Sequence, residues 1–508
     1  MPLPDVLIAL ATLGTAHSPA ELPPPPAALG ELLGQVEGPP EAQILLLAGA
    51  LSLQEMAGRQ PAKGVEPLPA TSAPDDRPRA PEAAARYLLQ MLGGEHKEVL
   101  PEWLAAAHAR GQRPPEELLP YLLDLGLKRA ELRPLLFPLL GPRAIWLAEQ
   151  AGMGSWAYFR LDDVESVWQQ AESPVRAALL AHLRWRDPAR GRELLASTWR
   201  SEGARQREKF LQELAQGLGP EDEPFLEAAL DDRARGVRLA AGELLALIPG
   251  SAFNRRMAER ATALLSLRRG WRGTRLSLND EVARADATWD RDGLPVELSQ
   301  DTTLTKAGWM LQQVLPYVPP VYWLRLWQVK PDELLALARP APDEHHFLNG
   351  LGWASYRAGD DDFALLLLCE ALPELDDDLL RRLLPQLPAA RLDGALLPWL
   401  QRREVFTPKH PAFAALLADS QPWSHELAAA VIAAVSSTLH PANINPSPEM
   451  KSLLQHLALH APPETSRGLL ARLQAQNRPE LQKGWKKAAG EMRLALDYRR
   501  RMLGAFDR

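Results

Sequence analysis

Two clusters of basic residues carry the clearest chemical signal in this 508-residue sequence. Residues 255–275 contain seven arginines and one glutamate, with Trp271 inside a Gly-Trp-Arg-Gly turn, and residues 483–508 contain eight basic and three acidic residues. Arginines beside an aromatic ring and flexible glycines suit the binding of backbone phosphates with base stacking. They also suit ion pairs with acidic surfaces, either of the same chain or of a protein partner. The candidate partner-binding residues of the first cluster are Arg268, Arg269, Trp271 and Arg272.

The charge of the rest of the chain bears on the choice between these partners. The whole sequence has a formal net charge of −7 and a pI near 6.0, so the residues outside the two clusters are strongly acidic. Such a surface opposes the approach of a polyanion. The sequence therefore favours a protein partner. It keeps a nucleic-acid-binding protein, using the clusters at 255–275 and 483–508, as the alternative.

Other chemically capable residues lack the spacing of a known site. His456 and His460 share one face of a helix, but no glutamate follows His456, so the zinc-protease signature is absent. The single cysteine, Cys369, excludes an intramolecular disulfide and a cysteine-based zinc site. Phosphate-binding loops, dinucleotide fingerprints, nucleophile elbows and kinase signatures are missing. We expect no catalytic, cofactor or metal site, while scattered carboxylates and histidines leave an enzyme open.

Helices are the elements expected to position these residues. Leucine and alanine dominate, and the β-branched residues that favour strands are scarce. Proline makes up 47 of the 508 residues, and many prolines border apolar runs, as they do at helix ends. The apolar run at 44–51 is far below the ~18 residues of a membrane span. We expect an all-α, cytoplasmic protein that does not enter a membrane, with its oligomeric state left open.

A 31-residue repeat organises the centre of the chain. Two series recur at this step: Arg176, Arg207 and Arg238, and Leu183, Leu214 and Leu245. A unit of this length holds two short helices, and one pair cannot bury its apolar face alone, so neighbouring pairs must stack. The leucines are therefore expected to be buried at equivalent positions. The arginines either form a ladder that binds phosphate or an acidic partner, or bridge neighbouring turns through carboxylates and carbonyls.

Several segments resemble known repeat proteins. LEAALDDRARGVRLAAGELLALI at 226–248 is similar to short HEAT repeats, a likeness that covers residues 165–265 well. The wider layout resembles an uncharacterised bacterial family of helical-repeat proteins, a domain of unknown function, through LATLGTA at 10–16, LLGPRAIWLAEQ at 139–150 and RDGLP at 291–295. These resemblances imply an α-solenoid of HEAT-like antiparallel helix pairs. They imply no particular chemistry.

Composition divides the chain into five parts. Residues 1–59 are an acidic helical module, and residues 60–81 are a proline-rich linker that we expect to be extended and mobile. HEAT-like helical repeats follow at 82–265. Residues 266–303 are expected to form an irregular insertion or capping loop, and residues 304–508 are expected to form C-terminal helical repeats.

Fifteen tryptophans complete the set of candidate contact residues. Most are expected to fill gaps between helices, but Trp323 and Trp327, one helical turn apart, are predicted to form an aromatic contact surface. Repeat arrays offer long surfaces without a closed pocket. The sequence therefore predicts a non-enzymatic helical scaffold or adaptor that binds a protein partner. The nucleic-acid alternative is similar to HEAT-type DNA-repair glycosylases, which grip phosphates in a basic groove.

Overall fold

The computed structural model confirms the all-α prediction. Helices dominate the described chain, in which the strands are β1 (Leu265–Gly270) and β2 (Gly273–Leu278). The chain divides into two compact units, Met1–Thr71 and Ser72–Arg508. The structure describes residues 3–14, 30, 38–58, 70–151, 164–271, 273–297, 303–339, 344–402, 404–438, 445–465 and 483–507.

The described part of the N-terminal unit is helical. It contains α1 (Leu3–Leu13) and α3 (Pro40–Gly58). The two helices bury a small core of Leu7, Leu10, Ile44 and Leu47. Large apolar side chains remain on their outer faces, and those more than 60% exposed are Ile8, Leu13, Leu45, Leu53 and Met56.

The last part of the predicted linker is packed, which contradicts the expectation of an extended, mobile segment there. Arg77 donates hydrogen bonds from Nη1 to Pro138 O (2.7 Å) and from Nη2 to Leu139 O (3.1 Å). Gly141 permits this approach, because a Cβ atom there would lie 1.9 Å from a carboxylate oxygen of Asp75. The prediction was wrong because hydrogen bonds to distant backbone oxygens and the burial of Ala80 hold this segment. Residues 59–69 lie outside the described part of the chain.

The second unit is a succession of short helices joined by turns. Polar caps begin several of them: Ser251 accepts from Asn254 N–H, and Asp360 accepts from Phe363 N–H. Prolines occupy the first turn of others, as their positions predicted. The helices are α4 (Glu82–Leu92), α5 (Leu100–Ala109), α6 (Leu119–Lys128), α7 (Arg133–Leu136), α8 (Pro142–Ala151), α9 (Val164–Gln170), α10 (Ser173–Arg186), α11 (Pro188–Thr198), α12 (Ala204–Leu214), α13 (Glu223–Ala229), α14 (Arg235–Ala246), α15 (Ala252–Leu264), α16 (Ala287–Arg291), α17 (Lys306–Val314), α18 (Pro320–Trp327), α19 (Pro331–Ala338), α20 (Glu344–Ala358), α21 (Asp361–Ala371), α22 (Asp377–Leu383), α23 (Ala389–Leu400), α24 (Pro411–Ala418), α25 (His425–Ser437), α26 (Pro448–His460) and α28 (Lys483–Gly504).

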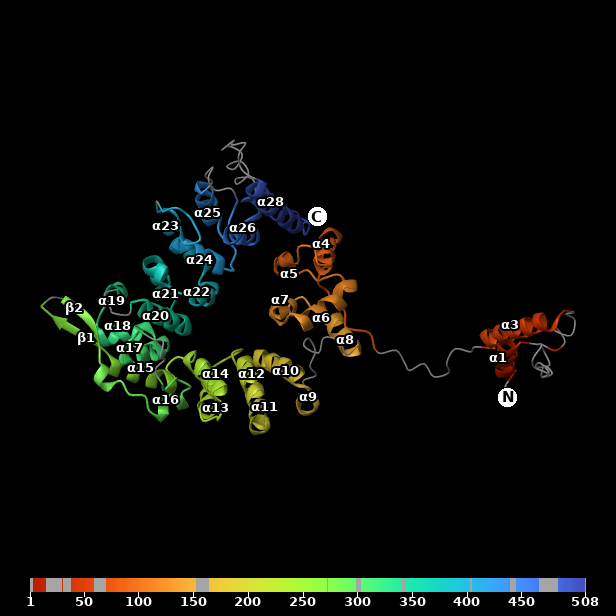
Figure 1. Cartoon of the computed structure of the whole chain (residues 1–508), viewed down its shortest axis with the longest axis horizontal. Helices are drawn as coiled ribbons and strands as arrows, with labels where there is room; N and C mark the ends of the chain where they lie inside the picture. The colour runs from red at the N-terminus through yellow and green to blue at the C-terminus, as the bar shows by residue number, and fades with distance from the viewer. Residues whose placement is uncertain are drawn as a thin grey trace. The chain divides into compact units, whose positions relative to one another are not determined.

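The 31-residue repeat corresponds to helices α9 to α14. Leu183, Leu214 and Leu245 lie in α10, α12 and α14 and are 2%, 0% and 0% exposed, as predicted. α10 packs on α12, and α12 packs on α14; Figure 1 shows the three helices in a row. Their buried side chains belong to one hydrophobic core that also includes the helices from α15 to α28.

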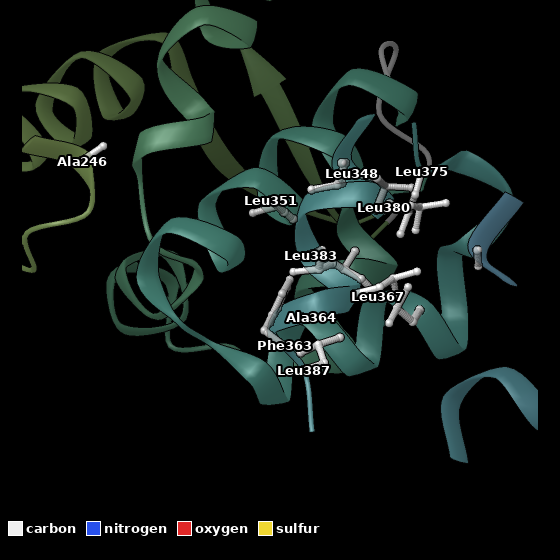
Figure 2. Close-up of a cluster of buried hydrophobic side chains, with 14 of the residues drawn as sticks. Ala246, Leu348, Leu351, Phe363, Ala364, Leu367, Leu375, Leu380, Leu383 and Leu387 are labelled. Carbon is white, nitrogen blue, oxygen red and sulfur yellow. The ribbon is translucent and has the colours of Figure 1, made fainter. Parts of the chain in front are cut away.

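The C-terminal helices continue this core with leucine. In Figure 2, buried side chains of α20, α21 and α22 point toward one another. The buried leucines at this contact include Leu348, Leu351, Leu367, Leu380 and Leu383. Leucine suits such a core because it combines strong helix propensity with a large apolar surface.

Residues 266–303, expected to be irregular, contain a regular β-hairpin. β1 and β2 pair antiparallel, and Arg268 lies opposite Arg275. Gly273 has a φ angle of +111°, which L-residues rarely adopt, so glycine permits the tight turn between the strands. The chain then returns to α14 and α15, where it buries Trp289, Asp292 and Leu294. The expectation was wrong because the glycines here close a hairpin.

The last helix packs against the first helices of the second unit. Phe506, just after α28, lies in the hydrophobic core of α4 to α8, with its ring 5.3 Å from that of Trp103. Arg499 of α28 donates to both carboxylate oxygens of Glu102, at 2.7 and 2.8 Å. Figure 1 shows α28 beside α4. This contact joins residues 397 positions apart in the chain.

Candidate functional site

The three arginines of the repeat bridge neighbouring segments, which is the second of the two readings that the sequence allowed. Arg176 pairs with Glu202. Arg207 donates from Nη2 to Asp232 Oδ1 at 3.0 Å, and Arg238 pairs with Asp290 at 2.7 Å. Their side chains are only 9% to 16% exposed. They hold the helix pairs together, and their guanidinium groups are already occupied.

Trp323 and Trp327 do not form the predicted aromatic contact surface. They are 0% and 8% exposed, and their rings pack on each other with centroids 4.7 Å apart. Arg269 of the hairpin donates to the backbone oxygen of Trp327 at 3.0 Å. The prediction was wrong because α18 packs against other elements, including the hairpin, and the apolar face of such a helix is its buried face.

The basic cluster at 255–275 has two parts with different surroundings. Its helical part, in α15, surrounds the buried carboxylate of Asp292, which pairs with Arg256 at 2.7 Å and with Arg260 at 2.8 Å. Arg291 lies 3.6 Å from the same carboxylate. This charge network neutralises Arg256 and Arg260 of α15 and does not include Arg255. The sequence analysis did not identify Asp292, although the RDGLP segment that carried the family resemblance contains it.

The hairpin part of the cluster is the exposed part. Arg268 and Arg275 face each other across the two strands, and neither forms an ion pair with any residue that the structure describes. Trp271, at the turn, is 89% exposed. In Figure 1 the hairpin projects past α18 and α19. Arg272 lies outside the described residues, so the structure leaves this candidate untested.

The basic cluster at 483–508 is partly paired within the chain. Arg499 is 5% exposed and donates to Glu102 and to two backbone oxygens. Arg500 and Arg493 share the carboxylate of Asp497, at 3.1 and 4.0 Å. In this cluster, Arg501 forms no ion pair with any described residue. Much of the positive charge predicted here is therefore locally neutralised.

An apolar groove lies next to the hairpin's supporting helices, and the sequence analysis did not anticipate it. The groove has a volume of about 800 Å³ and is built from α14, α15, α18 and α20. Its walls include Ala258, Tyr322 and Leu326, and Leu326 is 45% exposed. Arg255 and Arg325 lie at its edges together with one acidic residue, Glu259. α15, which forms part of the groove, leads directly into β1. Arg269 of β1 donates a hydrogen bond to α18, which also forms part of the groove, so two helices of the groove contact the hairpin.

His456 and His460 are packed into the fold rather than arranged around a metal ion. Their rings stack with centroids 4.1 Å apart, and they bond the backbone oxygens of Asp419 and Gln421. Burial lowers the pKa of His460 to about 4. Burial also raises the pKa of the Asp419 carboxyl to about 6. Within the described residues, no three histidine, cysteine or acidic side chains cluster so that they could hold a metal.

Comparison with known proteins gives one match, to a protein family. No curated protein matches the sequence. Among the helices that the structure describes, none has both the length and the apolar composition needed to cross a membrane. Residues 6–506 match a family of unknown function, DUF5691, which agrees with the resemblance found in the sequence. Because the match covers nearly the whole chain, this protein belongs to the DUF5691 family.

Proposed function

We propose that this protein is a cytoplasmic, non-enzymatic α-solenoid of HEAT-like helix pairs that binds an acidic protein partner at the β1–β2 hairpin. The observation that carries the proposal is Trp271, which is 89% exposed at the turn of the hairpin. Tryptophan and arginine are the residues most enriched at interface hot spots. A partner that covers this ring removes a large apolar area from water.

The facing arginines support an acidic partner. Like charges directly opposite each other in adjacent strands are destabilising. Arg268 lies opposite Arg275, and neither arginine has a carboxylate partner among the described residues. Carboxylates on a partner would relieve this repulsion and form charge-assisted hydrogen bonds. The hairpin therefore combines an apolar anchor with a fixed site for acidic groups.

The groove of α14, α15, α18 and α20 supports a protein rather than a small ligand. Its walls are mostly apolar, and its rim carries Arg255 and Arg325. An amphipathic segment with acidic residues beside its apolar face matches this pattern. Because two helices of the groove contact the hairpin, one partner can contact both the groove and the hairpin.

The nucleic-acid alternative has less support. Arg256 and Arg260 neutralise Asp292, and Arg499 neutralises Glu102. These ion pairs lower the number of cations that the two clusters can offer to phosphates, and affinity for nucleic acid rises with the number of phosphates contacted. The single exposed cysteine, Cys369, fits a reducing compartment such as the cytoplasm.

The test places a photo-crosslinking amino acid at position 271 in living cells. We expect a specific protein to crosslink from this position and not from position 185, where Trp185 is also exposed, at 67%. With that protein purified, Trp271→Ala and the double variant Arg268→Glu/Arg275→Glu should each weaken binding at least about tenfold, because both remove hot-spot groups. Trp185→Ala is the matched control and should bind as the wild type does.

Two results would contradict the proposal. One is a partner whose affinity is the same for the wild type and for Trp271→Ala. The other is a shift of single-stranded or duplex DNA by submicromolar wild-type protein in 0.15 M salt, lost in the Arg268→Glu/Arg275→Glu variant, which would favour the nucleic-acid alternative.

A further inference from the structure

We propose that the cleft between α4 and α28 binds the phosphoryl groups of a small molecule. The cleft has a volume of about 610 Å³, within the range of small-molecule sites, roughly 300 to 1,000 Å³. Three arginines line it, Arg86 from α4 and Arg500 and Arg501 from α28, and its lining contains no carboxylate. The helices of this cleft are not those that form the apolar groove or support the hairpin. This proposal therefore does not depend on the proposed protein partner.

The arginines give the cleft a positive charge that a bound anion would balance. Arg500 has one carboxylate partner, Asp497 at 3.1 Å, whereas Arg86 and Arg501 form no ion pair with described residues. Three guanidinium groups on two packed helices repel one another. The guanidinium stays charged at any physiological pH, and its planar fork matches the oxygens of a phosphoryl group. A bound phosphoryl group would turn this repulsion into attraction across the two helices.

Neighbouring contacts hold the walls of the cleft in place. The Tyr498 hydroxyl donates to Gln90 Oε1 at 3.4 Å, which leaves the Gln90 amide N–H groups as donors. The ring of Tyr498 packs edge-to-face on Tyr87, with centroids 5.1 Å apart. Burial raises the pKa of Tyr498 to about 12, with Tyr87, Glu95 and Glu98 adding to the effect, so the hydroxyl remains a donor. A ligand therefore meets the Gln90 amide as a positioned donor beside the arginines.

Gly504 gives a direct way to close the cleft. It lines the cleft, and a Cβ atom added there would meet no heavy atom within 4 Å. Gly504→Glu should therefore fold and should place a carboxylate among the arginines. Gly504→Ala fills the same open position without charge, so it is the matched control.

The experiment titrates inorganic pyrophosphate into the full-length protein by calorimetry, at constant ionic strength near 0.15 M. We expect saturable binding by the wild type and by Gly504→Ala, and at least about tenfold weaker binding by Gly504→Glu. Arg86→Ala/Arg501→Ala should show the same loss. Arg205→Ala/Arg382→Ala removes two other exposed arginines that form no ion pair with described residues, and it should bind normally.

A second measurement locates the site. Pyrophosphate should slow amide hydrogen exchange in α4 and α28, because a bound anion bridges these helices. The proposal fails if wild-type protein shows no saturable binding, if Gly504→Glu binds like Gly504→Ala, or if protection appears only elsewhere. Trp271→Ala should keep full pyrophosphate binding, so failure of the partner proposal and failure of this one are distinguishable.

Discussion

Replacement of Arg184 by methionine should lower the free energy of unfolding by about 3 to 5 kcal/mol, the usual cost of leaving a buried charge without its partner. Arg184 is 0% exposed and pairs with the buried carboxylate of Asp222 at 2.6 Å. Its guanidinium also donates to four backbone oxygens, those of Pro188, Leu214, Gln216 and Gly217. The side chain thus joins α10 to the end of α12 and to the turn before α13. Methionine fills similar volume but satisfies none of these acceptors.

Chemical denaturation followed by circular dichroism measures this loss. Arg186→Met is the matched control, because Arg186 lies on the same helix and is exposed, and its change should stay within about 0.5 kcal/mol. The double variant Arg184→Met/Asp222→Leu should lose less stability than Arg184→Met alone, since it also removes the buried carboxylate, which Arg184→Met leaves with Arg192 as its ion-pair partner at 2.9 Å. Equal stability of Arg184→Met and Arg186→Met would contradict this account of the buried pair.

Replacement of His460 by glutamine should alter the change in the free energy of unfolding between pH 8 and pH 5 by about 2 kcal/mol. The pKa of His460 is lowered by burial from 6.5 to about 4. Between these values the unfolded chain binds a proton that the folded chain does not, so the histidine's contribution to stability is present above pH 6.5 and is lost as pH falls toward 4. His460→Gln should therefore gain stability relative to the wild type on acidification.

Asp419 has the opposite effect on the pH dependence of stability. This effect should be the same in the wild type and in His460→Gln. The pKa of Asp419 is raised to about 6, so the folded chain takes up a proton first and gains stability as pH falls through that value. The difference between His460→Gln and the wild type, measured by denaturation at pH 8 and pH 5, isolates the histidine. His425→Gln is the control because His425 is exposed on α25. A constant difference across this pH range would show that His460 is not a buried neutral base.

The helices were predictable because their signals are local. Apolar spacing, polar caps and border prolines act within a few residues, so the all-α fold followed from them. The 31-residue step also predicted that Leu183, Leu214 and Leu245 would be buried, because equivalent positions of stacked units face the same core. The alternative reading of the Arg176 series, as bridges to carboxylates, rested on the same periodicity.

The errors and omissions all concern contacts with distant residues. Trp323 and Trp327 carried the composition of a contact surface, but the packing of α18 under the hairpin buries them. Arg184 lies outside the repeated series, and its partner Asp222 is 38 positions away. The segment at 266–303, which was expected to be irregular, contains a hairpin whose turn Gly273 permits.

The basic residues show the division between sequence and tertiary structure best. Their number and clustering were determined by the sequence. Which of them remain available was decided by tertiary structure alone, because a guanidinium is neutralised by whichever carboxylate folding brings within a few ångströms. Folding places Asp292 beside Arg256 and Glu102 beside Arg499, and it leaves Arg268 opposite Arg275 and Arg86 in the same cleft as Arg501.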